Sequence, residues 1–224
     1  MMDFCKIVGS IVWKDILLES RTKDISLSII IFASLVLLIF NFAVEPTTQI
    51  MAIVAPGIMW IAITFSGVLG LTRSLALEKE SGNLHALMTS PISRESIFYG
   101  KMLSNFLFMF FTVVIVFPIF TVLFNVSTFS INLYLIAMLT IIGTSCAGTL
   151  FATMAINTRS REIMLPLLFL PIIVPIVIAA VEATGPLMTN TNTGSQYQWI
   201  YLLGVMDLIL LVICPLGFSI IIEE

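Results

Sequence analysis

The sequence predicts an all-α integral membrane protein with six transmembrane helices, an amphipathic helix before them and one long polar loop that contains a short helix. Of its 224 residues, 59% are hydrophobic and only 10% are charged, against about 25% charged in soluble domains. Its mean hydropathy is +1.11. Six apolar stretches reach or approach the roughly 20 residues that a helix needs to cross the hydrocarbon core.

The N-terminal stretch predicts a helix over residues 3–22 that lies in the membrane interface, with Trp13 at its margin. Apolar residues recur at helical spacing, and polar residues fall largely on the other side. The apolar set is Phe4, Ile7, Val8, Ile11, Val12 and Leu18, and the polar set is Lys6, Ser10, Lys14 and Asp15. A charged cluster from Glu19 to Asp24 then turns the chain into the bilayer. Since this stretch lacks the pattern of a secretory signal, we expect it to be retained.

The six spans are predicted at about 25–44, 50–72, 97–124, 131–156, 163–183 and 199–222. No linker or repeat divides them, so residues 1–224 are expected to form one transmembrane domain. Prolines at 166, 171 and 175 predict that the fifth span is kinked or split, and Pro215 with Gly217 predicts a bend in the sixth. In the fourth span, Thr144, Gly148 and Ala152 recur every four residues beside Gly143 and Ala147, which favours close helix packing.

The cations fix the predicted orientation. All ten lie on one side of a six-span arrangement, whereas five or seven spans would scatter them over both sides: Lys6, Lys14, Arg21, Lys23, Arg73, Lys79, Arg94, Lys101, Arg159 and Arg161. The positive-inside rule therefore predicts that both termini, the 73–96 loop and the 157–162 loop are cytoplasmic.

The interval from Arg73 to Lys101 is the longest polar stretch of the chain and a candidate docking surface. It predicts two short helical segments, one that ends at Gly82 and one from Leu84 to Met88, with Asn83 as the cap and Pro91 just beyond the end. Leu84 and Leu87 share a face of the second segment, and we expect a partner to bury them.

Asp207 is the one acidic residue placed well inside a predicted span, about a third of the way into the sixth from the outer side. An unpaired carboxylate there costs about 2.5 kcal/mol or more, so the side chain should face protein or water. It is a candidate intramembrane polar site, and a role in a pathway and a role in helix–helix bonding both stay open. The aromatic residues Trp60, Tyr197, Trp199 and Tyr201 are expected to pack or to mark the membrane interface.

Several classes of chemistry are disfavoured. The chain has no GxxxxGK[ST] loop, so we expect any ATPase to be another chain, and it has no HExxH or CxxC motif. Cys5, Cys146 and Cys214 show no paired spacing, and the net charge of −3 provides no basic field for nucleic acid. His85, the single histidine, is expected to contact a partner or solvent instead of binding haem or a metal. We therefore expect no catalytic residues, cofactor or metal.

Three stretches together resemble the haem exporter protein B family, CcmB, of cytochrome c maturation, and more broadly the permeases of ABC-2 exporters. They are WKDILLESRTK from Trp13, LTRSLALEKESGNLHALMTSP from Leu71, and the YGK of Tyr99 to Lys101. The resemblance implies the ABC-2 permease fold and a permease subunit that forms a homodimer with a separate ATPase, CcmA, and acts with CcmC and the haem chaperone CcmE. It also implies a coupling helix within residues 74–92 seated on the ATPase, with Glu78, Glu80, Gly82, Leu84 and Leu87 as the coupling residues.

The resemblance leaves the cargo open, since the cycle could export haem or release the haem-loaded chaperone. The alternatives are an ABC-2 permease for a lipid, glycan or drug, and a membrane assembly scaffold that transports nothing. The expected location is a bacterial inner membrane, because the N-terminus lacks an Arg-rich, acid-poor transit segment.

Overall fold

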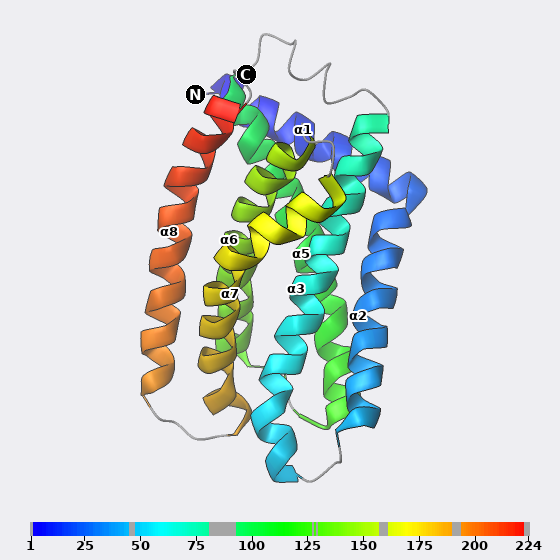
Figure 1. Cartoon of the computed structure of the whole chain (residues 1–224), viewed down its shortest axis with the longest axis vertical. Coiled ribbons are helices and arrows are strands. Elements are labelled where there is room, and N and C mark those ends of the chain that lie inside the picture. Colours follow the sequence, from blue (N-terminus) through cyan, green and yellow to red (C-terminus); the bar gives the residue numbers. More distant parts are fainter. Residues whose placement is uncertain are drawn as a thin grey trace.

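The computed structural model describes residues 2–44, 48–80, 93–126, 128, 130–156, 161–189 and 194–221. These residues form seven helices and no strand, which confirms the all-α prediction (Figure 1). The helices are α1 (Met2–Thr22), α2 (Asp24–Ala43), α3 (Thr48–Glu80), α5 (Arg94–Phe124), α6 (Ile131–Ile156), α7 (Arg161–Met188) and α8 (Ser195–Ile221).

Six of these helices are long and apolar enough to cross a membrane, as the hydropathy pattern predicted: α2, α3, α5, α6, α7 and α8. Three boundaries differ from the prediction by four residues or more. The third helix continues to Glu80, so the first predicted helical segment of the polar interval is continuous with the second span instead of separate from it. At the other end of the bundle, α7 extends to Met188 and α8 begins at Ser195, which shortens the predicted 184–198 loop.

The prolines of α7 bend the helix without splitting it. Its helical backbone is continuous from Arg161 to Met188, and Figure 1 shows its first turns running at an angle to the rest. A proline removes one helical hydrogen bond and forces its ring against the preceding turn, which is enough to kink a helix. The alternative of a split fifth span is therefore wrong, while the predicted kink is confirmed.

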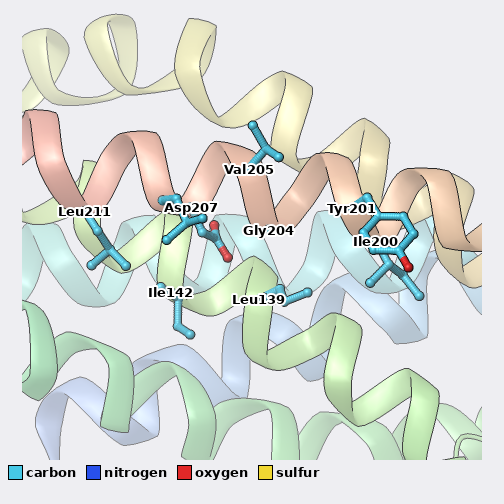
Figure 2. Close-up of a pocket in the computed structure, with 9 residues that line it drawn as sticks. Leu139, Ile142, Ile200, Tyr201, Gly204, Val205, Asp207 and Leu211 are labelled. Carbon is cyan, nitrogen blue, oxygen red and sulfur yellow. The ribbon is translucent and has the colours of Figure 1, made fainter.

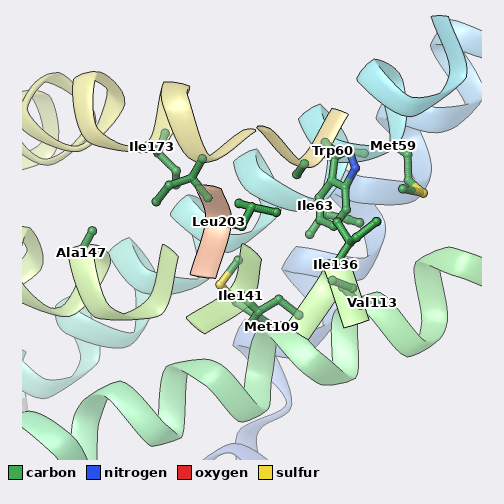
Figure 3. Packing of buried hydrophobic residues seen from close by; sticks show 14 of the residues in the cluster. Met59, Trp60, Ile63, Met109, Val113, Ile136, Ile141, Ala147, Ile173 and Leu203 are labelled. Carbon is green, nitrogen blue, oxygen red and sulfur yellow. The ribbon is translucent and has the colours of Figure 1, made fainter. Parts of the chain in front are cut away.

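The centre of the bundle is α6, and about two thirds of its span is buried. Side chains from α3, α5, α7 and α8 converge on it (Figure 3). Gly148 lies so close to α3 and α7 that a Cβ atom there would overlap Leu71 and stand 3.4 Å from Phe169. Because apolar helices gain no hydrophobic energy from each other within lipid, such close contact is what holds them together. The small-residue stripe of α6 thus serves the packing that was predicted.

Polar side chains add bonds between distant helices. The buried indole of Trp60 on α3 donates a hydrogen bond of 3.0 Å to the Thr184 hydroxyl on α7. Asn105 on α5 donates to Thr149 on α6 over 3.0 Å. Trp60 is therefore a packing residue, whereas Tyr197 and Tyr201 on the first turns of α8 are largely exposed.

Helix α1 lies across one end of the bundle instead of joining it (Figure 1). A single residue, Lys23, separates it from α2 and has left-handed backbone angles, φ 56° and ψ 9°. The turn is closed by the Lys23 N–H, which donates to the Glu19 carbonyl over 2.7 Å. Both chain termini lie at this same end.

Candidate functional site

The described cations gather at the end of the bundle where α1 lies, as predicted. They occupy α1 and its elbow, the last turns of α3 and the first turns of α5 and α7: Lys6, Lys14, Arg21, Lys23, Arg73, Lys79, Arg94, Lys101 and Arg161. Arg159 lies outside the described residues. We call this the cation end of the bundle. Its position fits an interface with anionic headgroups or with a soluble partner.

The predicted coupling residues fall only partly within the described structure. Glu78 and Glu80 lie in the last turn of α3, which ends at Glu80. Seven helical residues carry Glu80 about 10 Å past Arg73, where the polar interval begins. Gly82, Leu84 and Leu87 lie outside the described residues, as does His85. The first predicted helical segment is thus a continuation of α3.

The Tyr99–Lys101 stretch fastens α1 to α5, and each of its three residues contacts a different residue of α1. The Tyr99 ring packs edge-on against Phe4 with 6.0 Å between centroids. Gly100 admits Ile11 so closely that a Cβ there would lie 2.9 Å from the Ile11 Cβ. We call these contacts, together with the Lys101 ion pair, the α1–α5 junction.

Lys101 forms the polar part of this junction. Its Nζ lies 2.9 and 3.0 Å from the two carboxylate oxygens of Asp15, and the two side chains are only 12% and 11% exposed. Lys14 stands 3.2 Å from the same carboxylate. Asp15 therefore faces α5, which corrects its predicted place on the polar side of α1. A signal was available in the sequence: a lysine inside the predicted span 97–124 needs a counter-charge, and α1 carries an aspartate.

The first turns of α5 also contact α8. The Tyr99 hydroxyl donates to the Leu211 carbonyl over 3.4 Å, and Arg94 donates to the Ser219 carbonyl over 3.4 Å. Phe98 packs edge-on against Phe218. The first turns of α5, which follow residues 74–92, thus contact both α1 and α8. A displacement of these turns would therefore move both helices.

Asp207 lies near the middle of α8, deeper than predicted because α8 begins at Ser195. Its side chain points toward α6 (Figure 2), and the residue is only 4% exposed. A Cβ at Gly143 would overlap Asp207 Oδ1, so the glycine makes the room that the carboxylate occupies. Neither carboxylate oxygen has a hydrogen-bond partner among the described residues.

A pocket of about 450 Å³ adjoins Asp207 between α6 and α8. Apart from Asp207 its lining is apolar or aromatic: Leu139, Ile142, Ile200, Tyr201, Gly204, Val205, Leu208 and Leu211. The burial of Asp207 against α6 agrees with the prediction that it faces protein or water. Among the described residues, Asp207 forms no hydrogen bond to another helix. Its carboxylate oxygens can therefore accept a hydrogen bond from a donor group in the pocket.

Cys146 and Cys214 are buried in α6 and α8, and the Cys146 thiol donates to the Leu210 carbonyl over 3.2 Å. The tertiary structure thus brings α6 and α8 together around two thiols that sequence spacing did not pair. Over the described ranges, no group of three or more potential His, Cys, Asp or Glu ligands is assembled.

The fold and these features define a multi-pass α-helical membrane protein whose amphipathic first helix is fastened to the cation end of a six-helix bundle. Residues 6–223 match the CcmB protein family, and the chain belongs to that family.

Relatives of similar length carry the name heme exporter protein B. The one from Rhodobacter capsulatus is 31% identical over 154 residues, which are 67% of this chain and 70% of the relative. The one from Pseudomonas aeruginosa is 24% identical over 197 residues, 87% of each chain. The one from Paracoccus denitrificans is 31% identical over 155 residues, 68% of this chain and 70% of the relative.

Proposed function

We propose that this chain is the permease subunit of an ABC transporter complex that serves haem export in cytochrome c biogenesis. The observation that carries the proposal is the CcmB family match over residues 6–223, together with relatives named heme exporter protein B. The six apolar helices supply the transmembrane part that a permease needs. Residues 1–224 would act as one transmembrane domain in this role.

A separate chain related to CcmA would supply ATP hydrolysis, since this sequence has no GxxxxGK[ST] loop. CcmC-like and CcmE-like proteins would handle haem, and two copies of this chain would form the transmembrane core. The cargo step is haem export or release of a haem-loaded chaperone.

The cation end would face the cytoplasm of a bacterial inner membrane, in line with the positive-inside rule. There the extension of α3 with Glu78 and Glu80, followed by Gly82, Leu84 and Leu87, would sit on the ATPase. A movement of the ATPase would be transmitted directly to α3, and through residues 81–93 to α5. The α1–α5 junction and the contacts of Arg94 and Tyr99 with α8 support this route.

The coupling assignment is tested by purifying the chain with its candidate ATPase. Glu80→Ala or Leu84→Ser should weaken co-purification about tenfold, which is about 1.4 kcal/mol of binding free energy. Glu95→Ala is the matched control, because Glu95 is an exposed acid at the same end of the bundle. Equal retention of the ATPase by all three variants would contradict the assignment.

The cargo is tested by adding haem, or the haem chaperone, to the purified complex and measuring ATP hydrolysis. A response to haem favours export, and a response to the chaperone favours its release. Stimulation by a lipid, glycan or drug instead would favour an ABC-2 permease for that substrate. ATP hydrolysis in reconstituted vesicles with no solute flux and no response would favour the scaffold alternative.

A further inference from the structure

A pocket of about 520 Å³ lies at the elbow where α1 turns into α2, with α5 as its third wall. Its volume is in the range of ligand-binding pockets. The lining divides into a polar part at the elbow and an apolar part on the spans. The polar residues are Glu19, Ser20, Lys23 and Ser26, and the apolar residues are Ile16, Leu27, Ile30, Leu107, Phe108 and Phe111.

Glu19 supplies an unsatisfied acceptor to the polar part. The residue is only 6% exposed, and Oε1 accepts a hydrogen bond of 2.6 Å from the Ser26 N–H in the first turn of α2. Oε2 is buried and has no hydrogen-bond partner among the described residues. A buried carboxylate oxygen is stabilised only when a donor reaches it. The site therefore calls for a ligand that carries a hydrogen-bond donor, preferably a cationic one.

Lys23 supplies the opposite charge. Its side chain is exposed, and none of the ion pairs within the described part of the chain includes it. Lys23 and Glu19 thus line the same pocket without pairing with each other. A ligand that carries an anionic and a cationic group side by side would satisfy both residues.

The apolar part opens toward the bilayer. Leu27 on α2 and Phe111 on α5 are 53% and 52% exposed, and both lie on membrane-spanning segments. A hydrocarbon chain can therefore enter from the lipid phase and lie along α2 and α5 while its polar end stays at the elbow. This arrangement matches a phospholipid in the leaflet at the cation end.

We propose that the elbow pocket binds one molecule of phosphatidylethanolamine, with its phosphate on Lys23, its ammonium on Glu19 and an acyl chain along α2 and α5. The headgroup explains the choice of lipid. Phosphatidylcholine has the same two charges but no N–H to donate to Glu19, and phosphatidylglycerol has no cation. The bound lipid fills the angle between α1 and α2 and so braces the amphipathic helix against the bundle.

The test is native mass spectrometry of the full chain in detergent, with phosphatidylethanolamine, phosphatidylcholine or phosphatidylglycerol added at equal concentration. We expect phosphatidylethanolamine to be retained about fivefold more than either other lipid. Lys23→Gln should lower its retention about fivefold, the effect of one cation near a membrane surface. Glu19→Gln keeps an acceptor for Ser26 but places an NH₂ group in the pocket, so it should remove the preference over phosphatidylcholine.

Arg21→Gln is the matched control, since Arg21 is a neighbouring exposed cation that does not line the pocket. Equal loss of lipid in Arg21→Gln and Lys23→Gln would overturn the proposal, because it would show general attraction to basic residues. Equal retention of all three lipids would also overturn it.

A second measurement uses the unaltered chain, so it does not depend on how the variants fold. Phosphatidylethanolamine with a photoreactive acyl chain should crosslink to peptides that contain residues 27–30 and 107–111. Crosslinks spread evenly over the exposed faces of α2, α5 and α8 would show annular lipid and overturn the proposal.

Discussion

Replacing Lys101 with methionine should release α1 from the bundle. The substitution keeps most of the aliphatic chain and removes the ammonium, which leaves Asp15 as a carboxylate only 11% exposed. At 3 Å the pair attracts by about 5.5 kcal/mol for an effective dielectric constant of 20, and desolvation of both groups offsets part of this. Lys14, 3.2 Å from the same carboxylate, compensates part of the loss. We therefore expect docking of α1 to weaken by about 2–3 kcal/mol.

Hydrogen–deuterium exchange of the full chain in lipid nanodiscs measures this change, because exchange of protected amides reports the free energy of local opening. A loss of about 2–3 kcal/mol corresponds to about 30- to 150-fold faster exchange in residues 4–18. The spans should keep their protection. Lys6→Met is the matched control, since Lys6 is exposed on the same helix and enters none of the ion pairs of the described residues.

A double-mutant cycle makes the prediction stricter. Asp15→Asn combined with Lys101→Met removes both charges, so the double variant should open less readily than Lys101→Met alone, with a coupling energy of at least about 1 kcal/mol. The reasoning is refuted if exchange in α1 is unchanged by Lys101→Met, or if Lys6→Met accelerates it equally.

Three further predictions concern the helix packing and are checked by thermal unfolding of the purified chain. Gly143→Ala should lower the free energy of unfolding by about 1–3 kcal/mol, because the new methyl group would overlap Asp207 Oδ1 and stand 3.1 Å from Ile176. Adding Asp207→Ala should recover much of this loss. Additive losses in the double variant would exclude the contact. Asp207→Asn should raise the unfolding temperature, because it removes a buried charge that has no partner among the described residues. A lower unfolding temperature would indicate that Asp207 has a partner outside the described residues. Thr184→Val should lower the free energy of unfolding by about 1–3 kcal/mol, because it leaves the buried Trp60 indole N–H without an acceptor. Thr184→Ser keeps the hydroxyl and should stay near the native stability. Similar losses in both variants would contradict the hydrogen bond.

Some elements that the sequence misplaced were nonetheless predictable. Residues 75–80, LALEKE, consist of strong helix formers, so the continuity of the predicted helical segment with the second span could have been anticipated from helix propensity. The depth of Asp207 depended on where α8 begins, and polar residues from Ser195 to Gln198 obscured that start. Helix ends are decided by small free-energy differences, so the first and last residues of a helix are harder to predict from sequence than the presence of the span.

The sequence by itself determined the class of the protein, the six spans, the gathering of cations at one end and the small-residue stripe. These follow from hydropathy, charge and residue spacing, which act locally or are set by the thickness of a bilayer. Only the tertiary structure decided that Tyr99, Gly100 and Lys101 fasten α1, that Asp207 lies against Gly143, and that Glu19 and Lys23 share a pocket with α5. Such contacts join residues far apart in the chain, for example the 86 positions between Asp15 and Lys101. They depend on which helix faces meet, and no local pattern specifies that.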